Sequence, residues 1–504
     1  NGNEAEGFML NVMRGPRDYT EDLDRRVLQL DFDDQQTRWV SGLDFAYTPT
    51  SALDMKLTLG FDYADQENVM NAPFGGWWVP LGERAARRYR VETRTIDFRT
   101  TYRAELGGVA SSTSTGFEVF DEQFKDVFGL STTFAGPHDP TLTSGAIRDV
   151  VENQFREVNA GFFVQEQLGF ADRYFLTAGV RVDGNSAFGD DFGLQAYPKL
   201  SASYVISDEA FWPDFFEMTK LRAAYGESGK APGFFDAEKV WSPVRAKEDE
   251  AGVTPENPGN PGLGPERSRE IEAGIEASTL EGRVGVDFTY YYQRTSDALI
   301  PVTLDPTLGF QGSQLRNVGT LDNWGVEFAL DTEPVRTRNI SWSLGFILST
   351  NKSEVKDLGG SPPIFRGRSI WVREGYPVAS IFAEKVLNPN EIAEPILAED
   401  PDPNFGNNVF LGPVFPETNY SVNTQLRLGD NLRISSRGEF KGGGNQWSAV
   451  SNFNTTRTVW PPCFDAQVAM EAGDLSQVTA LERARCRDFR RGTHVYGTDF
   501  FRLR

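Results

Sequence analysis

Alternating apolar and polar residues between Ile271 and Tyr292 predict a β-hairpin. The apolar positions of its two strands are Ile271, Ala273, Ile275 and Ala277, then Val284, Val286, Phe288, Tyr290 and Tyr292. The intervening positions are mostly polar, and a period of two is typical of a strand with one apolar and one polar face. The link Thr279–Gly282 is short enough for a tight antiparallel turn. A soluble sandwich alternates in the same way, so this hairpin alone does not decide the fold.

The same alternation recurs along most of the chain and predicts about 14 strands by the period-two criterion. They fall near residues 39–47, 55–63, 89–105, 108–120, 154–169, 173–183, 196–207, 218–228, 271–277, 284–292, 324–330, 342–348, 422–428 and 432–440. The last residues, Phe500–Arg504, look like the start of another strand. An antiparallel sheet of this size must close on itself or split.

The connections between the predicted strands are alternately short and long. We interpret six segments as long loops, near residues 65–88, 121–153, 229–266, 298–322, 353–420 and 441–498, with one further strand inside them near 376–387. This alternation places the long loops at one end of the sheet and the short turns at the other. Outer-membrane barrels have this layout, with long extracellular loops and short periplasmic turns.

The mid-strand charges agree with a membrane barrel. In a large barrel the polar face lines a hydrated lumen, and the apolar face contacts lipid. The sequence therefore predicts an all-β fold, namely a large antiparallel transmembrane β-barrel of which about 14–16 strands are present.

Composition and charge exclude several classes of function. The formal net charge is −22, which argues against nucleic acid as a partner, because phosphate contacts require clustered Lys and Arg. Surface solubility and acidic outer loops explain this acidity equally well. No run of 18 apolar residues is present, so no transmembrane helix is expected. With two histidines and no CxxC motif, neither a zinc site nor a histidine-based catalytic centre is expected, and the protein is not predicted to be an enzyme.

The two cysteines, Cys463 and Cys486, lie in the same predicted loop. A disulfide formed in an oxidising compartment is the favoured interpretation, and two unpaired thiols are the alternative.

Several segments resemble the TonB-dependent outer-membrane transporters, specifically their SusC/RagA-like branch. They are Arg173–Gly189, Lys220–Gly229, Pro265–Ser268 with Glu270, Glu272 and Gly274, Asn317–Thr320 with Asn323–Phe328, Asn351–Leu358, and Phe500–Arg504. Each fragment is weakly specific, but together they occur in the family's order. The resemblance covers roughly 160–504 by motif and 1–159 by pattern only.

The resemblance implies a barrel of about 22 strands in the complete protein, closed by an N-terminal plug domain. Residues 1–504 are expected to be the barrel portion, incomplete at both ends and without the plug. The implied function is active import of an oligosaccharide or peptide across the bacterial outer membrane. The implied partners are a SusD-like surface lipoprotein, the TonB complex, and outer-membrane lipid and lipopolysaccharide, with transporter–lipoprotein pairs that associate as dimers.

Candidate substrate contacts follow from position in the predicted barrel. Trp77 and Trp78 lie beside two glycines in a long loop and either stack on sugar rings or pack within that loop. Polar mid-strand residues would face the lumen; these are Arg181, Arg222, Asp287 and Glu327. Glu272 and Glu276 are interpreted as solvated lumen carboxylates rather than a glycosidase pair.

A structural calcium ion is the one cofactor that the sequence suggests. Asp400, Asp402 and Asn404 have part of the spacing of a calcium loop, but the turn glycine and the bidentate glutamate of that motif are missing.

Two other functions remain open at this point. One is a barrel that acts as a scaffold or anchor for a surface assembly. The other is a siderophore or vitamin receptor of the same superfamily.

Overall fold

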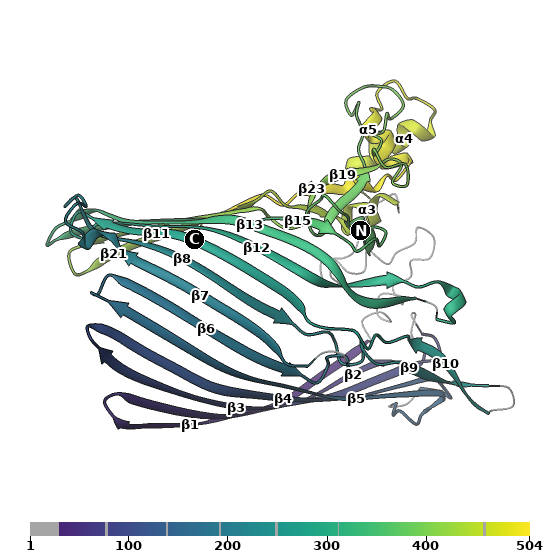
Figure 1. Cartoon of the computed structure of the whole chain (residues 1–504). Helices are drawn as coiled ribbons and strands as arrows, with labels where there is room; N and C mark the ends of the chain where they lie inside the picture. Colours follow the sequence, from purple (N-terminus) through teal and green to yellow (C-terminus); the bar gives the residue numbers. More distant parts are fainter. Residues whose placement is uncertain are drawn as a thin grey trace.

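The computed structural model describes residues 30–75, 79–137, 140–190, 193–246, 250–310, 312–456 and 460–503. Within this part of the chain, most residues belong to antiparallel β-strands (Figure 1). Among the residues described, no helix is long and apolar enough to cross a membrane.

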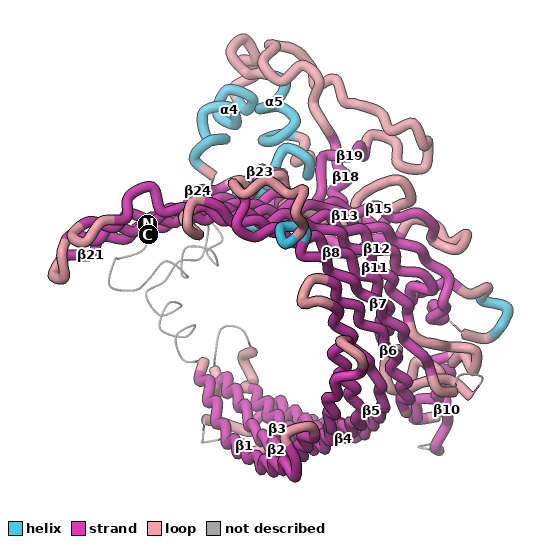
Figure 2. Tube along the Cα trace, turned by 60° about the vertical axis from the view of Figure 1, so that its left-hand side comes forward, coloured by secondary structure: helices cyan, strands magenta, loops and turns pink. Residues whose placement is uncertain are grey.

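The main sheet contains 16 strands, and most are hydrogen-bonded to the next strand in chain order. Its strands are β1 (Asp31–Thr50), β2 (Leu53–Ala72), β3 (Glu83–Leu106), β4 (Val109–Phe134), β5 (Gly145–Phe170), β6 (Tyr174–Asn185), β7 (Gln195–Val205), β8 (Phe216–Lys230), β11 (Glu266–Thr279), β12 (Val284–Thr303), β13 (Ser313–Arg336), β14 (Ile340–Thr350), β15 (Lys352–Asp357), β20 (Thr418–Leu428), β21 (Leu432–Gly442) and β24 (Phe500–Leu503). The exceptions to chain order are that β8 pairs with β11, β14 with β20, β21 with β24, and β15 with β13. Figure 2 shows this sheet curving around a hollow. The predicted large antiparallel barrel fold is confirmed.

The two ends of the sheet differ in their connections. Short links such as Gly107–Gly108 and Leu280–Arg283 lie at the left of Figure 1, which we call the turn end. The longer links lie at the opposite end, which we call the loop end. This is the predicted division between short periplasmic turns and long extracellular loops.

Several strands extend further into the loop end than predicted. β4 and β5 are each 26 residues long, whereas about 9–11 tilted residues cross a bilayer. The predicted loops at 65–88, 121–153 and 298–322 are therefore wrong over much of their length. In these extensions the backbone hydrogen bonds between neighbouring strands continue, although the alternation of apolar and polar side chains is lost.

The other three predicted loops also contain regular structure. The segment 229–266 holds the hairpin of β9 (Val240–Arg245) and β10 (Ala251–Asn257). The segment 353–420 holds a four-stranded sheet in which the strand predicted near 376–387 appears as β18; the four are β16 (Ile364–Gly367), β17 (Ile370–Val372), β18 (Ser380–Glu384) and β19 (Asn408–Pro413). The segment 441–498 holds β22 (Asn445–Trp447), β23 (Val495–Gly497) and the helices α3 (Ala449–Thr456), α4 (Pro461–Glu471) and α5 (Ala480–Glu482).

Short helical turns complete the fold. They are η1 (Ile206–Asp208) at the turn end, η3 (Pro306–Leu308) at the loop end, the π-helical turn η4 (Arg483–Arg487) and η5 (Arg491–His494).

The described residues of the segments 358–417 and 443–499 pack together at the loop end, and we call them the outer module (Figure 1). The two segments are joined by backbone hydrogen bonds, including the Ala480 amide to the Glu391 carbonyl at 2.7 Å. A cluster of buried apolar residues, Ile300, Val355 and Leu358, links the module to β12 and β15. The outer module is therefore a folded unit attached to the barrel wall.

Register separates the main sheet into one apolar and one polar face. Leu221, Ile275, Phe288 and Phe328 are directly paired across β8, β11, β12 and β13. The neighbouring polar row contains Arg222, Gly274, Thr289, Glu327 and Ser349. Because a polar face is too costly to expose to lipid, the polar face lines the hollow, and we call it the inner wall.

Candidate functional site

Arg222 and Asp287, which the sequence placed on the inner wall separately, are ion-paired in the structure. Arg222 Nη1 donates to Asp287 Oδ2 at 2.8 Å, and Nη2 also donates to Thr289 Oγ1. One row away, Lys220 Nζ lies 2.7 Å from Glu276 Oε2. Both side chains of the Arg222–Asp287 pair remain about one third or more exposed, as expected for groups that face a hydrated lumen.

Glu327 and Arg181 lie on the same wall. Glu327 borders a cavity of about 630 Å³ with Arg222 and Asp287, and it has no ion-pair partner among the residues that the structure describes. Arg181 lies further around the wall, where it pairs with Asp183 at 2.8 Å and with Glu118 at 3.1 Å. The structure thus brings Arg222, Asp287 and Glu327 together and leaves Arg181 in a separate group.

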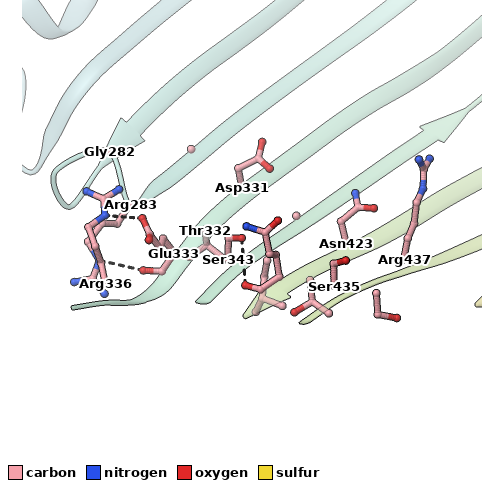
Figure 3. A pocket seen from close by; sticks show the side chains of 16 residues that line it. Gly282, Arg283, Asp331, Thr332, Glu333, Arg336, Ser343, Asn423, Ser435 and Arg437 are labelled. Carbon is pink, nitrogen blue, oxygen red and sulfur yellow. Dashed lines mark hydrogen bonds and ion pairs between the residues drawn. The ribbon is translucent and has the colours of Figure 1, made fainter. Parts of the chain in front are cut away.

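A second cavity, of about 680 Å³, continues the inner wall towards the turn end (Figure 3). The two cavities share Gly285 and Asp331. Asp331, Gly345, Asn423 and Arg437 form one paired row across β13, β14, β20 and β21. The wall therefore offers an almost continuous surface of hydrogen-bonding and charged groups.

At the turn end the second cavity is bordered by a small polar cluster that includes Arg283, Glu333 and Arg336. Glu333 accepts from Arg336 Nε at 2.5 Å and from Ser341 Oγ at 2.8 Å, and its carbonyl accepts from Arg283 Nε at 3.1 Å. Sequence reasoning missed these residues and Arg437. Of these residues, only Arg437 could have been found from the sequence, because it occupies a polar position of a strand with alternating polar and apolar residues.

The sequence also singled out a pair of loop tryptophans and a pair of strand glutamates. Trp77 and Trp78 lie outside the described residues, so their role in substrate stacking stays a prediction. Glu272 and Glu276 both occupy β11, and Glu276 is held by Lys220.

The candidate calcium residues Asp400, Asp402 and Asn404 lie in the outer module, where Arg373 forms ion pairs with both aspartates. Arg373 Nη1 lies 3.0 Å from Asp400 Oδ2, and Nη2 lies 3.7 Å from Asp402. The backbone amides of Asp402 and Asn404 donate to Asp400 and Asp402 at 2.9 and 3.0 Å. Among the described residues no group of three or more His, Cys, Asp or Glu is placed to hold a metal. Calcium binding by this motif stays a prediction, and the structure shows turn hydrogen bonds and an ion pair at these residues.

A disulfide joins Cys463 of α4 to Cys486 of η4. Near it, Glu394 is held by Arg483 at 2.9 Å and by Arg487 at 2.7 Å. The hydrogen bonds from Arg487 and Arg483 lower the pKa of Glu394 to about 2. His494 is fully buried and its Nδ1 lies 2.9 Å from Ser451 Oγ; burial lowers its pKa to about 4, so it is neutral at physiological pH. These contacts fix the helical part of the outer module.

Replacing Arg222 and Asp287 by alanine, singly and together, tests whether the inner wall is hydrated. A solvated pair contributes roughly 0.2–1 kcal/mol, so we expect a small coupling energy in a double-mutant cycle. The measurement is urea unfolding of the barrel in micelles, with the equivalent cycle on the Arg181–Asp183 pair as a control. A coupling above about 3 kcal/mol would indicate a dry, buried pair instead.

Comparison with known proteins identifies related sequences. Residues 3–455 match a protein family described as TonB dependent receptor-like, beta-barrel. TonB-dependent receptor P26 of Formosa agariphila is 33% identical over 338 residues, which make up 62% of this chain and 33% of that protein. TonB-dependent receptor SusC of Bacteroides thetaiotaomicron is 25% identical over 252 residues, 47% of this chain and 24% of that protein.

A solved structure shares the fold. The structure of the RagAB peptide transporter superposes with a TM-score of 0.74 at 17% identity, and the match covers 85% of this chain and 50% of that chain. The chain thus spans about a third of the length of receptor P26 and half of the matched RagAB chain.

Proposed function

Because this chain belongs to the TonB-dependent receptor-like β-barrel family, we propose that it forms the barrel of an outer-membrane importer for a bulky nutrient, either an oligosaccharide or a peptide. The observation that carries this proposal is the inner wall, whose ion pairs and two joined cavities provide polar contacts along the hollow. Such a surface is suited to hydroxyl, amide and charged groups. Arg222, Asp287 and Glu327 are the proposed substrate contacts on it.

The mechanism requires no covalent chemistry. Substrate would enter at the loop end, pass along the inner wall and leave at the turn end, where the TonB complex supplies the energy from the periplasm. The similar proteins described above are named as receptors or as a transporter, not as enzymes.

A SusD-like surface lipoprotein is the proposed partner at the loop end. The outer module exposes large apolar side chains there, including Ile392, Ile396 and Phe464, each more than half exposed. Exposed apolar groups of this kind are typical of protein interaction surfaces. Lipid and lipopolysaccharide would surround the apolar face, and the transporter–lipoprotein pairs would associate as dimers.

Uptake of labelled oligosaccharides and peptides by whole cells tests this function. We expect the gene for the full-length protein to be required for uptake of one of the two classes. Deletion of TonB should abolish that uptake, because active import needs its energy, and deletion of the lipoprotein gene should reduce it. The control is an uptake system for an unrelated nutrient that also depends on TonB.

The outcomes separate the alternatives. If deletion of the gene for the full-length protein left uptake of every glycan and peptide unchanged, this result would contradict the import function and favour the surface scaffold. Dependence of growth on iron chelates or cobalamin, without any need for the lipoprotein, would favour a siderophore or vitamin receptor.

A further inference from the structure

A groove crosses the apolar face near the turn end, and its floor is made of small residues. Ala202, Ala223 and Ala273 are directly paired across β7, β8 and β11, and all three are exposed. Leu176 of β6 continues this row at one end. The alanine row therefore lies lower than the surface on either side of it.

Bulky side chains form both walls of the groove. The row nearer the turns contains Tyr174, Tyr204 and Leu221, and the row on the other side contains Leu200, Tyr225 and Ile271. Each wall lies two residues from the alanine row, which is about 6.8 Å at the rise of an antiparallel strand. An open cavity of about 550 Å³ lies over Ala202 and Ala223, against the wall nearer the turns, and its lining is mainly apolar.

A pair of opposite charges lies beside the wall nearer the turns. Tyr174 and Tyr204 stack with their ring centres 4.8 Å apart. The Tyr174 hydroxyl donates to Glu209 Oε1 at 2.7 Å, and Arg173 Nη1 lies 3.3 Å from Glu209 Oε2. Tyrosine rings with one apolar and one polar end are favoured at the membrane–water interface. This edge of the groove therefore has the chemistry of the headgroup region.

From this arrangement we propose that the groove binds one acyl chain of a phospholipid from the periplasmic leaflet, with the headgroup at Arg173 and Glu209. The inference rests on the proposed membrane function, which places the apolar face in lipid and the turns in the periplasm. The narrow alanine floor admits a hydrocarbon chain between two rows of large side chains. The Arg173–Glu209 pair complements the phosphate and the ammonium of a phosphoethanolamine headgroup.

Native mass spectrometry of the detergent-solubilised full-length protein with added dioleoylphosphatidylethanolamine tests the proposal. The double substitution A202L/A223L fills the floor of the groove, so it should weaken retention of this lipid by about tenfold. That factor corresponds to a loss of about 1.4 kcal/mol of binding free energy. Arg173→Gln should weaken retention while leaving the groove open. The matched control is Ala160→Leu, on the same face of β5 but away from the groove.

Equal retention by wild type and A202L/A223L would overturn the proposal, as would preferential retention of lipopolysaccharide, which belongs to the opposite leaflet. Loss of retention in A202L/A223L with wild-type behaviour of Ala160→Leu would support it. Lipid retention is measured without transport, so its failure leaves the uptake experiment to decide the proposed function independently.

Discussion

Replacing Arg373 by methionine is expected to destabilise the outer module by about 3–5 kcal/mol, the usual cost of leaving one charge of a buried pair without its partner. The side chain of Asp400 is 2% exposed and that of Arg373 is 14% exposed. The guanidinium also lies 4.3 Å from the ring centre of Phe405 and 5.0 Å from that of Tyr376. A third ring, that of Phe382, has its centre 5.3 Å from the guanidinium, so the substitution removes the ion pair with Asp400 and three cation–π contacts from the centre of an aromatic cluster.

The effect should depend on pH in a defined direction. Burial raises the pKa of Asp400, but the hydrogen bonds from Arg373 and from the Asp402 amide outweigh burial, and the net pKa is lowered. A lowered pKa in the folded protein contributes stability above the unfolded value of about 3.9, and this contribution is lost as pH falls through the folded pKa. The difference between wild type and Arg373→Met should therefore be largest at neutral pH and shrink in acid.

Hydrogen exchange of the outer module in the full-length protein measures this change. Arg336→Met is a matched control, because Arg336 and its partner Glu333 lie at the end of β13 with the Arg336 side chain about half exposed, and such a pair contributes at most about 1 kcal/mol. The double variant R373M/D400N should recover part of the loss, since no unpaired charge remains. Equal protection of wild type and Arg373→Met would contradict the structural role assigned to this arginine.

Removing the disulfide with C463S/C486S should cost the outer module about 3 kcal/mol, from the entropy that a closed loop of this length removes from the unfolded chain. The cysteines are 23 residues apart in sequence, and both are buried. The helices α4 and α5 are short, and isolated helices of such length are marginal in water. We therefore expect the bridge to decide whether residues 461–487 remain folded.

Limited proteolysis of cells or outer-membrane preparations tests this expectation. Cleavage within residues 461–487 should be faster in C463S/C486S than in wild type, while the barrel stays intact. A reducing agent should reproduce the effect in wild type and should change nothing further in the double variant. Resistance of C463S/C486S equal to that of wild type would show that packing alone holds the helices.

Alternation was sufficient to predict the strands that cross the membrane and the face each residue occupies. The hairpin between Ile271 and Tyr292 was predicted from period two, and its register pairs Ile275 with Phe288. The signal failed where a strand leaves the membrane, as between Asp121 and Phe134 of β4. There the backbone hydrogen bonds to β3 and β5 maintain the strand, although apolar side chains are not confined to one face.

The sequence predicted which face of the sheet the candidate site residues occupy, but it did not predict which of them contact one another. Arg222 and Asp287 were both placed on the polar face, yet they are 65 residues apart in sequence and meet through the registers of β8, β11 and β12. The local spacing of Asp400 and Asp402 suggested calcium, which stays a prediction. No local pattern indicated their ion pair with Arg373, which lies 27 residues from Asp400.

The sequence by itself therefore determined the class of fold, the ends of the barrel that carry turns and loops, and the residues of the inner wall. These properties follow from the local requirement that lipid-facing side chains be apolar and lumen-facing ones polar. Only the tertiary structure decided the ion pairs, the folded outer module and the alanine groove. Each of these depends on strand register or on contacts between distant segments, which the order of apolar and polar residues does not specify.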